Sequence, residues 1–193
     1  MRFDDGTIRG IVFDLDGTLI DSYEAITASL NEAMAQLGRD PQPLDRVRLM
    51  VGHGLETLMA RALGVDAEAG APLIAQGVNV FRRHYDRICV DKTLLLPDVG
   101  ATLRALRARG YRMAVATNKP SYFARRLVDA LGIGAYLDSV LGPDLVSHHK
   151  PHPEMVLAAL ASMGLAPSEA IYVGDMEVDV ETARAAGMRV VVL

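Results

Sequence analysis

The sequence predicts an α/β protein with a doubly wound parallel sheet and an inserted α-helical domain. In the second half of the chain, short apolar strands alternate with amphipathic helices, a pattern that produces a parallel sheet. Residues 21–93, in contrast, contain helical patterns and no convincing strand. Polar side chains follow directly on several of the strands, and the ligand crevice of such a sheet lies at the carboxyl ends of its strands.

The first strand is expected over residues 8–13, and it leads directly into Asp14-Leu15-Asp16-Gly17. An extended chain points residues i and i+2 to the same side, so Asp14 and Asp16 can face one small space. At ~4 Å and an effective dielectric constant of ~20, two such charges repel by about 4 kcal/mol. The site therefore needs a cation, a shared proton or a lysine.

The region after this strand is interpreted as a separate small domain over the crevice, and it is a candidate lid. Asp21-Ser22 offers an N-cap for its first helix, and Gly38 is a helix stop. The predicted boundaries are residues 1–20 and 94–193 for the core and residues 21–93 for the helical insert. Further helices in the insert are expected over 44–50, 55–63 and 72–89.

The rest of the chain alternates between helix and strand after Pro97. Apolar runs bounded by glycine and proline indicate the strands, and Pro153 opens one helix at a position like N1. The expected order is helix 98–109, strand 113–116, helix 121–131, strand 138–142, helix 153–163, strand 170–173, helix 177–186 and strand 189–193.

Composition limits the class of protein. Of 193 residues, 50% are hydrophobic, which suits one core or a core with a smaller appendage, and the net charge of −4 without long charge blocks argues against nucleic-acid or polybasic membrane partners. Cys89 is the only cysteine, so no intrachain disulfide can form and a cytoplasmic location is expected. Residues 1–10 lack the apolar core of a signal peptide, and no apolar run approaches the ~20 residues of a membrane span.

The polar residues at the strand ends indicate phosphoryl transfer. Carboxylate oxygens suit a hard ion such as Mg²⁺. Hydroxyl, amide and ammonium groups can hold phosphate oxygens, while Gly17 and Gly174 let the backbone come close to a ligand. The residues expected at this edge are Asp14, Asp16, Thr117, Asn118, Lys150, Asp175 and Asp179.

These residues lie in four short motifs. In these motifs the chain resembles the haloacid dehalogenase superfamily of phosphohydrolases, most closely its phosphoglycolate phosphatase-like branch. The superfamily has a Rossmann-like core with an inserted cap. Looser matches to this branch are Gly52-His53-Gly54, Thr117-Asn118-Lys119-Pro120 and Lys150-Pro151-His152-Pro153. The four superfamily motifs are Asp14-Leu15-Asp16-Gly17-Thr18, Thr117-Asn118, Lys150-Pro151, and Gly174-Asp175 with Asp179.

The resemblance implies a role for each motif residue. Asp14 is the nucleophile that forms an aspartyl phosphate, and Asp16 protonates the leaving oxygen and then activates water. Thr117, Asn118 and Lys150 hold the phosphoryl group, and Lys150 also counts among the catalytic residues. The implied cofactor is Mg²⁺, held by the Asp14 side chain, the Asp16 backbone carbonyl and Asp175, with Asp179 nearby or bound through water.

We therefore expect a Mg²⁺-dependent phosphatase that acts on a small phosphorylated metabolite, with phosphoglycolate as the leading substrate. Asp16 favours a phosphate ester, because dehalogenating members lack an acid at that position. The insert matches the mobile cap of this branch, and His53 and Gly54 are its candidate substrate contacts; otherwise His53 is a loop residue.

Alternatives within the family are a pyrophosphatase or a sugar phosphomutase. A non-catalytic phosphate-binding or partner-binding module is the alternative of a different class, and the intact Asp14, Asp16 and Lys150 speak against it. The sequence leaves the exact ester, the cap residues that select it and the oligomeric state open.

Two further features bear on these expectations. His148, His149 and His152 suggest a zinc site, but adjacent histidines point apart and no cysteine assists them, so a transition-metal site is disfavoured. Family members usually continue for another loop, helix and edge segment beyond Val190 to Leu193, so truncation is one interpretation of this end. No motif residue is missing.

Overall fold

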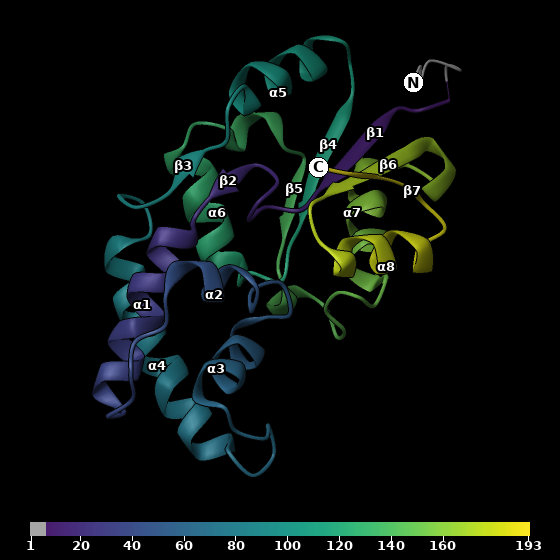
Figure 1. Ribbon diagram of the computed structural model, residues 1–193. Helices are drawn as coiled ribbons and strands as arrows, with labels where there is room; N and C mark the ends of the chain where they lie inside the picture. Colours follow the sequence, from purple (N-terminus) through teal and green to yellow (C-terminus); the bar gives the residue numbers. More distant parts are fainter. Residues whose placement is uncertain (1–6) are drawn as a thin grey trace. The chain divides into compact units, whose positions relative to one another are not determined.

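In the computed structural model, which describes residues 7–193, five strands form one parallel sheet in the order β5-β4-β1-β6-β7 (Figure 1). Ile11 of β1 lies opposite Met113 of β4 and Ile171 of β6. The predicted fold class is thus confirmed. Residues 1–6, which include much of the polar start discussed above, lie outside the described residues. The strands are β1 Gly10–Phe13, β4 Arg112–Ala116, β5 Ser139–Leu141, β6 Ala170–Gly174 and β7 Arg189–Val192.

Helices cover both faces of this sheet. The chain passes from β1 to β4 to β5 in one direction, and then returns past β1 to β6 and β7. Because parallel crossovers are right-handed, the connecting helices of the two passages fall on opposite faces. Helix α6 packs against β5 on one face, whereas α7 packs against β1 and β4, and α8 against β6 and β7, on the other (Figure 1). The helices are α5 Val99–Ala108, α6 Ser121–Ala130, α7 Glu154–Met163 and α8 Glu177–Ala185.

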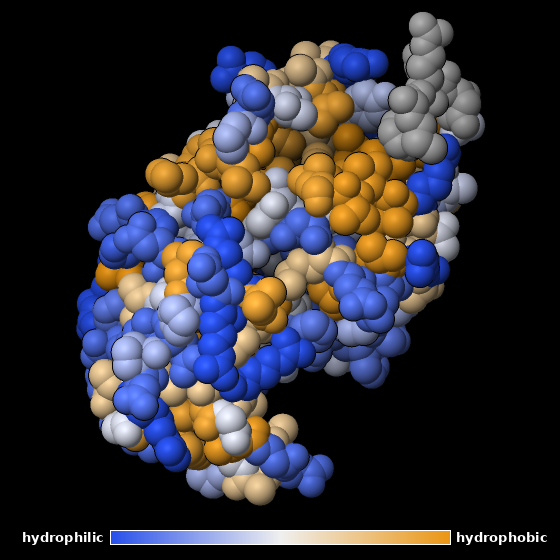
Figure 2. All heavy atoms as spheres, viewed as in Figure 1, coloured by the Kyte–Doolittle hydropathy of each residue, from blue (hydrophilic) through white to orange (hydrophobic). Residues whose placement is uncertain are grey.

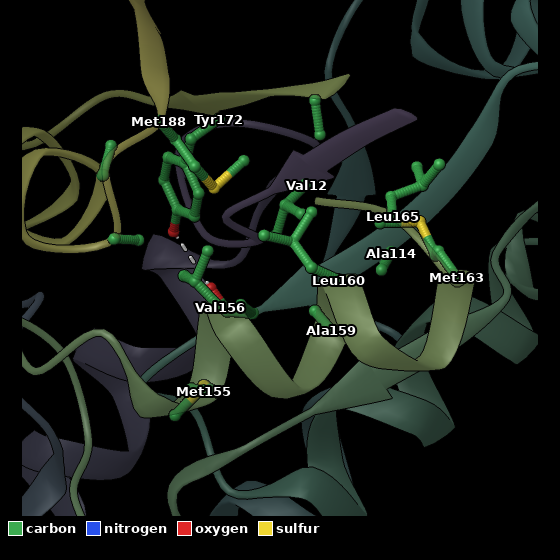
Figure 3. Packing of buried hydrophobic residues seen from close by; sticks show 14 residues of the cluster. Val12, Ala114, Met155, Val156, Ala159, Leu160, Met163, Leu165, Tyr172 and Met188 are labelled. Atoms are coloured by element: carbon green, nitrogen blue, oxygen red, sulfur yellow. Dashed lines mark hydrogen bonds between the residues drawn. The ribbon is translucent and has the colours of Figure 1, made fainter. Parts of the chain in front are cut away.

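The core on the α7 side is built from alternate strand residues and one face of that helix (Figure 3). Val12 and Ala114 point toward Val156 and Leu160, and all four are buried. Because helices cover both faces, the strands are apolar throughout rather than alternating between apolar and polar. Three short 3₁₀ segments lie in the connections, at η1 Gly134–Tyr136, η2 Pro143–Leu145 and η3 Pro167–Glu169.

Ser22–Thr93 form a second compact unit, distinct from the unit made of Met1–Asp21 and Leu94–Leu193. Its helix α1 packs against α4, and α3 also packs against α4. At Gly38, with φ +65°, α1 ends as expected: the Arg39 amide donates to the Met34 carbonyl at 2.8 Å. The interpretation of this unit as a cap stays a prediction. Its helices are α1 Tyr23–Gln36, α2 Leu44–Arg48, α3 Leu55–Leu63 and α4 Ala71–Ile88.

A two-stranded antiparallel sheet was not expected from the sequence. It pairs β2, Ile20–Asp21, with β3, Leu94–Leu95. Two-residue strands are too short to show a period, and their pairing joins segments far apart in the chain. Ser22 is the N-cap residue of α1, as predicted, but it has φ −111° and ψ 7° and makes no side-chain capping hydrogen bond, and Asp21 lies in β2. A capping residue usually has extended backbone angles.

The surface of the core unit includes an apolar area at β7, an edge strand of the sheet (Figure 2). Val192 and Leu193 are 53% and 68% exposed there. Among residues 7–193, none of the helices combines the length and apolar character needed to cross a membrane.

Replacing Leu160 by alanine should destabilise the core. Leu160 is 2% exposed, and removing a buried leucine costs about 2–5 kcal/mol through lost burial and the remaining cavity. Leu157 on the same helix is 42% exposed, so Leu157→Ala should stay within about 0.5 kcal/mol of the parent. Urea unfolding of both variants measures the difference, and equal losses would contradict the assigned helix face.

Candidate active site

The order of the strands brings three chain segments to one edge of the sheet. Because β1 lies between β4 and β6, the residues that follow these strands are neighbours. Asp14 follows β1, and its amide donates to the Val173 carbonyl of β6 at 2.9 Å. Thr117 follows β4 and Asp175 follows β6, as predicted from the sequence.

Lys150 is the buried cation of this edge. Its side chain is 1% exposed, and its Nζ atom lies 2.8 Å from Asp14 Oδ1 and 2.8 Å from Asp179 Oδ1. Burial alone lowers the pKa of a lysine, but the Asp14 and Asp179 carboxylates outweigh it and hold the pKa of Lys150 well above its usual range. Lys150 therefore supplies a permanent positive charge between two acids.

The Asn118 side chain fixes the backbone of Lys150 through two hydrogen bonds. Its Nδ2 atom donates to the Lys150 carbonyl at 3.1 Å, and the Lys150 amide donates to its Oδ1 atom at 3.0 Å. The side chain expected to bind phosphate is thus engaged in positioning Lys150. Its role as a phosphate ligand stays a prediction.

Asp14 and Asp16 have different surroundings. Burial raises the pKa of Asp14 to about 6, although the Lys150 ammonium lowers it. Asp16 instead pairs with Lys119, whose Nζ atom donates to Asp16 Oδ2 at 2.8 Å. The sequence analysis gave Lys119 no role. The sequence feature that could have indicated a role for Lys119 is its position directly after Thr117-Asn118, at the end of a strand.

Asp175 and Asp179 complete the acidic side of the site. Thr18 Oγ1 donates to Asp175 Oδ1 at 3.1 Å, while Asp179 Oδ2 accepts the amides of Asp175 and Met176 at 3.2 and 3.1 Å. Burial raises the pKa of Asp175. Asp179 is fully buried at the start of α8, so its carboxylate stabilises the N-terminus of that helix as well as the Lys150 charge.

Two glycines make this close packing possible. Gly17 has φ +85°, and a Cβ atom there would lie 2.2 Å from Asp175 Oδ2. A Cβ atom on Gly174 would lie 2.4 Å from Asp179 Oδ2. Gly17 therefore makes room for a carboxylate of another chain segment, and Gly174 for a carboxylate five residues further along its own segment.

The acids fit a magnesium site by their chemistry. Asp14, Asp175 and Asp179 each offer a carboxylate oxygen, and these atoms lie within 4.8 Å of one another. Oxygen-only ligands match the preference of Mg²⁺. Raised pKa values of Asp14 and Asp175 indicate that the acids repel and lack solvation, which a divalent cation would offset.

Tyr172 is a further member of the site that the sequence analysis missed. Its hydroxyl accepts a hydrogen bond from Lys150 Nζ at 3.0 Å. Asp179 Oδ1 and the Ala116 carbonyl each lie 3.1 Å from the hydroxyl oxygen, which can donate its one hydrogen to either. A tyrosine within an apolar strand was the available signal, because a buried hydroxyl needs a partner.

The candidate cap residues lie in the second unit. Gly52 and Gly54, with φ +114° and +90°, flank the half-buried His53 in the loop between α2 and α3. Within the described residues, His53 Nδ1 is buried and has no hydrogen-bond partner. Contact of His53 and Gly54 with a substrate stays a prediction.

The fold and the acidic site together define a hydrolase of the doubly wound α/β class. The model of the haloacid dehalogenase-like hydrolase family matches residues 11–193. The chain therefore belongs to the haloacid dehalogenase-like hydrolases, as the motifs indicated.

Curated relatives and solved structures agree with this assignment. The chain is 35% identical to the phosphoglycolate phosphatase of Escherichia coli (strain K12), covering 96% of this chain and 80% of the relative. It is 38% identical to that of Pseudomonas putida, covering 96% and 70%. A crystal structure of a predicted phosphoglycolate phosphatase from Haemophilus somnus 129PT matches with a TM-score of 0.89 and 30% identity, covering 96% of this chain and 85% of that one. CbbY from Rhodobacter sphaeroides, solved in complex with phosphate, matches with a TM-score of 0.80 and 26% identity, covering 96% and 85%.

Replacing Gly174 by alanine should displace Asp179. The added Cβ atom would meet Asp179 Cγ and Oδ2 at 2.4 Å, so we expect a loss of about 1–3 kcal/mol from overpacking. Gly100→Ala in α5 is the matched control, because its Cβ atom would have Leu95 Cδ1 as its nearest neighbour at 3.8 Å. Urea unfolding of both variants measures the effect. Equal stability of the two would show that Asp179 is not held against Gly174.

The raised pKa of Asp14 predicts a pH-dependent stability in metal-free solution. The folded state binds more protons than the unfolded state between the ordinary value of 3.8 and about 6, so stability falls as pH rises through this window. Asp14→Asn removes the titrating group. The unfolding free energy of the variant, taken relative to that of the parent, should therefore be higher at about pH 7 than at about pH 3.5.

The measurement is urea unfolding with a metal chelator at both pH values. If the difference in unfolding free energy between parent and variant is the same at both pH values, a raised pKa for Asp14 is contradicted.

Proposed function

We propose that this protein is a Mg²⁺-dependent phosphatase that hydrolyses a small phosphate monoester through an aspartyl-phosphate intermediate. The observation that carries the proposal is the pairing of two neighbouring acids with two different lysines: Asp14 with Lys150, and Asp16 with Lys119. Asp14 and Asp16 therefore stand in different electrostatic surroundings, as two different chemical tasks require.

Asp14 is the proposed nucleophile. Its carboxylate forms a bond to phosphorus while the bond from phosphorus to the ester oxygen breaks. Attack requires the ionised form, which burial opposes and the Lys150 ammonium at 2.8 Å favours. Splitting one displacement into two steps replaces attack by free water with attack by a group already in position.

Asp16 is the proposed proton carrier. In the first step it gives its proton to the leaving ester oxygen. In the second step its carboxylate takes a proton from the water that attacks phosphorus, which releases phosphate and regenerates Asp14. The Lys119 contact at 2.8 Å holds the Asp16 side chain in one orientation between the two steps.

Lys150, Thr117 and Asn118 are the proposed phosphate contacts. Lys150 Nζ lies within 3.0 Å of Asp14 Oδ1, Asp179 Oδ1 and the Tyr172 hydroxyl, so a phosphate oxygen would have to replace one of these neighbours. Asp14 loses its negative charge when it bonds phosphorus, so it is the acceptor that Lys150 can release. Thr117 Oγ1 accepts the Lys119 amide at 3.2 Å, so its own proton can be given to phosphate.

Asp14 and Asp175 would hold Mg²⁺ together with the Asp16 carbonyl, with Asp179 close by. The bound ion would supply positive charge for the oxygens of the transferring phosphoryl group. Asp179 is already paired with Lys150 and with two backbone amides, which supports its place beside the ion rather than as its main ligand.

Phosphoglycolate is the proposed substrate, supported by the names of the relatives with 35–38% identity. The second compact unit, Ser22–Thr93, is the proposed cap, with His53 and Gly54 as candidate contacts. In this family a cap closes over the substrate and excludes water. The cytoplasmic location remains a prediction.

The central test is hydrolysis of p-nitrophenyl phosphate with and without Mg²⁺. We expect Mg²⁺-dependent turnover and, because the nucleophile is removed, a loss of at least about a thousandfold in Asp14→Asn. Asp91→Asn, at an exposed position, is the matched control and should retain full activity. Parental turnover by a folded Asp14→Asn variant would contradict the proposed mechanism. Absence of turnover by the pure parent protein would contradict the proposal that the protein is an enzyme.

The substrate is tested separately with a panel of phosphoglycolate, inorganic pyrophosphate and hexose phosphates. The account expects the highest kcat/KM for phosphoglycolate. A preference for pyrophosphate, or phosphoryl transfer between positions of a sugar, would instead assign one of the alternative reactions. A flat profile would reject the specific substrate and leave a general phosphatase.

A further inference from the structure

Three side chains outside the acidic site converge where the loop that precedes α7 meets the first residue of that helix. His148 Nδ1 lies 2.8 Å from Glu154 Oε2, and His152 Nδ1 lies 4.0 Å from the same oxygen. One ligand atom from each of the three residues lies within 4.8 Å of the others. The sequence analysis disfavoured a site here because adjacent histidines diverge, but the structure pairs His148 with His152, four residues apart.

A turn explains this pairing. The His152 amide donates to the His149 carbonyl at 3.0 Å, which folds the loop back on itself. The imidazole rings of His148 and His152 consequently lie with their centroids 4.5 Å apart. His149 between them uses its Nδ1 atom on the Lys150 carbonyl at 2.8 Å instead. The loop therefore brings the rings of His148 and His152 together, whereas His149 has a different partner.

The Glu154 carboxylate is held in place for this pair. Its Oε1 and Oε2 atoms accept the amides of Ser147 and His148, each at 2.9 Å. These hydrogen bonds, of which the one from Ser147 contributes most, lower the pKa of Glu154. The carboxylate is therefore ionised at neutral pH. His152 Nδ1 accepts the Glu154 amide at 3.3 Å, so that nitrogen carries no proton, and a metal ion bound to it would take the place of this hydrogen bond.

Solvent can reach this cluster. His148 and His152 line a surface hollow of about 570 Å³ together with His149, Pro151, Pro153 and Ala185. Half or more of the His148 and His152 side chains is exposed. An ion could therefore enter without opening the core, and water could complete its coordination.

We propose that His148, His152 and Glu154 form a binding site for a divalent transition-metal ion such as Zn²⁺. Two imidazoles and one carboxylate are a donor set that suits Zn²⁺, with water in a fourth position. Tetrahedral Zn²⁺ with bonds of ~2.0–2.1 Å needs ligand atoms roughly 3.3 Å apart. The two separations from Glu154 Oε2, 2.8 and 4.0 Å, lie on either side of this value.

This site differs from the acidic site in ligand chemistry. Asp14, Asp175 and Asp179 offer oxygen alone, which suits Mg²⁺, whereas imidazole nitrogen favours Zn²⁺ over Mg²⁺. The ion would lie in the loop that carries Lys150 and would replace the hydrogen bond from His148 to Glu154. Because it would join two points of this loop to the first residue of α7, the ion is expected to make the loop more rigid.

The test is isothermal titration of the full chain, without a polyhistidine tag, with Zn²⁺ in an excess of Mg²⁺ that fills the acidic site. We expect one Zn²⁺ per chain. His148→Ala and His152→Ala should each lower the Zn²⁺ affinity by at least about tenfold, which is the lower end of what even indirect metal partners cost. His149→Ala is the matched control from the same loop and should leave the affinity unchanged.

A second measurement covers the case in which a histidine variant folds poorly. Anomalous diffraction at the zinc edge from crystals of the parent protein should show a peak within bonding distance of His148 and His152. No saturable binding, an anomalous peak only at the aspartates, or equal losses in His148→Ala and His149→Ala would overturn the site. Both readouts report binding alone, so they are independent of the proposed phosphatase activity.

Discussion

The buried ammonium group of Lys150 is the interaction on which the rest of the site depends. Asp14, Asp179 and Lys150 are each almost fully buried, and an isolated charge in such surroundings would be neutralised rather than kept. With Lys150 between them, the two carboxylates can remain close to each other at the end of the sheet. In the proposed mechanism, the same charge also faces the anionic phosphoryl group. Stability and proposed chemistry therefore rest on one contact.

The architecture explains how distant parts of the chain reach that contact. The strand order places β1 between β4 and β6, so Asp14 meets residues more than a hundred positions away. Asn118, at the end of β4, then fixes the backbone of Lys150, which arrives from a loop rather than from a strand. Gly174 removes the side chain that would otherwise keep Asp179 out. The ends of β1, β4 and β6, the loop before α7 and the start of α8 thus each contribute a positioned group.

Much of this arrangement could be predicted from the sequence, because it follows from local patterns. The apolar runs predicted the strands, and the alternation of side chains predicted that Asp14 and Asp16 face one space. The partner of Asp16 could not be predicted, since residue type alone does not choose among the three lysines of the chain, and Lys119 is identified only by its position in three dimensions. Tyr172 was taken as an ordinary strand residue because its hydroxyl contacts depend on tertiary packing. The pairing of His148 with His152 was likewise hidden, since it depends on a turn that residue types alone do not specify.

The central claim, that Lys150 holds the buried carboxylates in place, is tested most directly by a double-mutant cycle. Unfolding free energies are measured for the parent, Lys150→Met, Asp179→Asn and the double variant. Removing one partner of a buried ion pair costs about 3–5 kcal/mol, because the other charge stays buried and unpaired. The account predicts that the double variant loses less than the sum of the two single losses, by more than about 1 kcal/mol. Additive losses would contradict it.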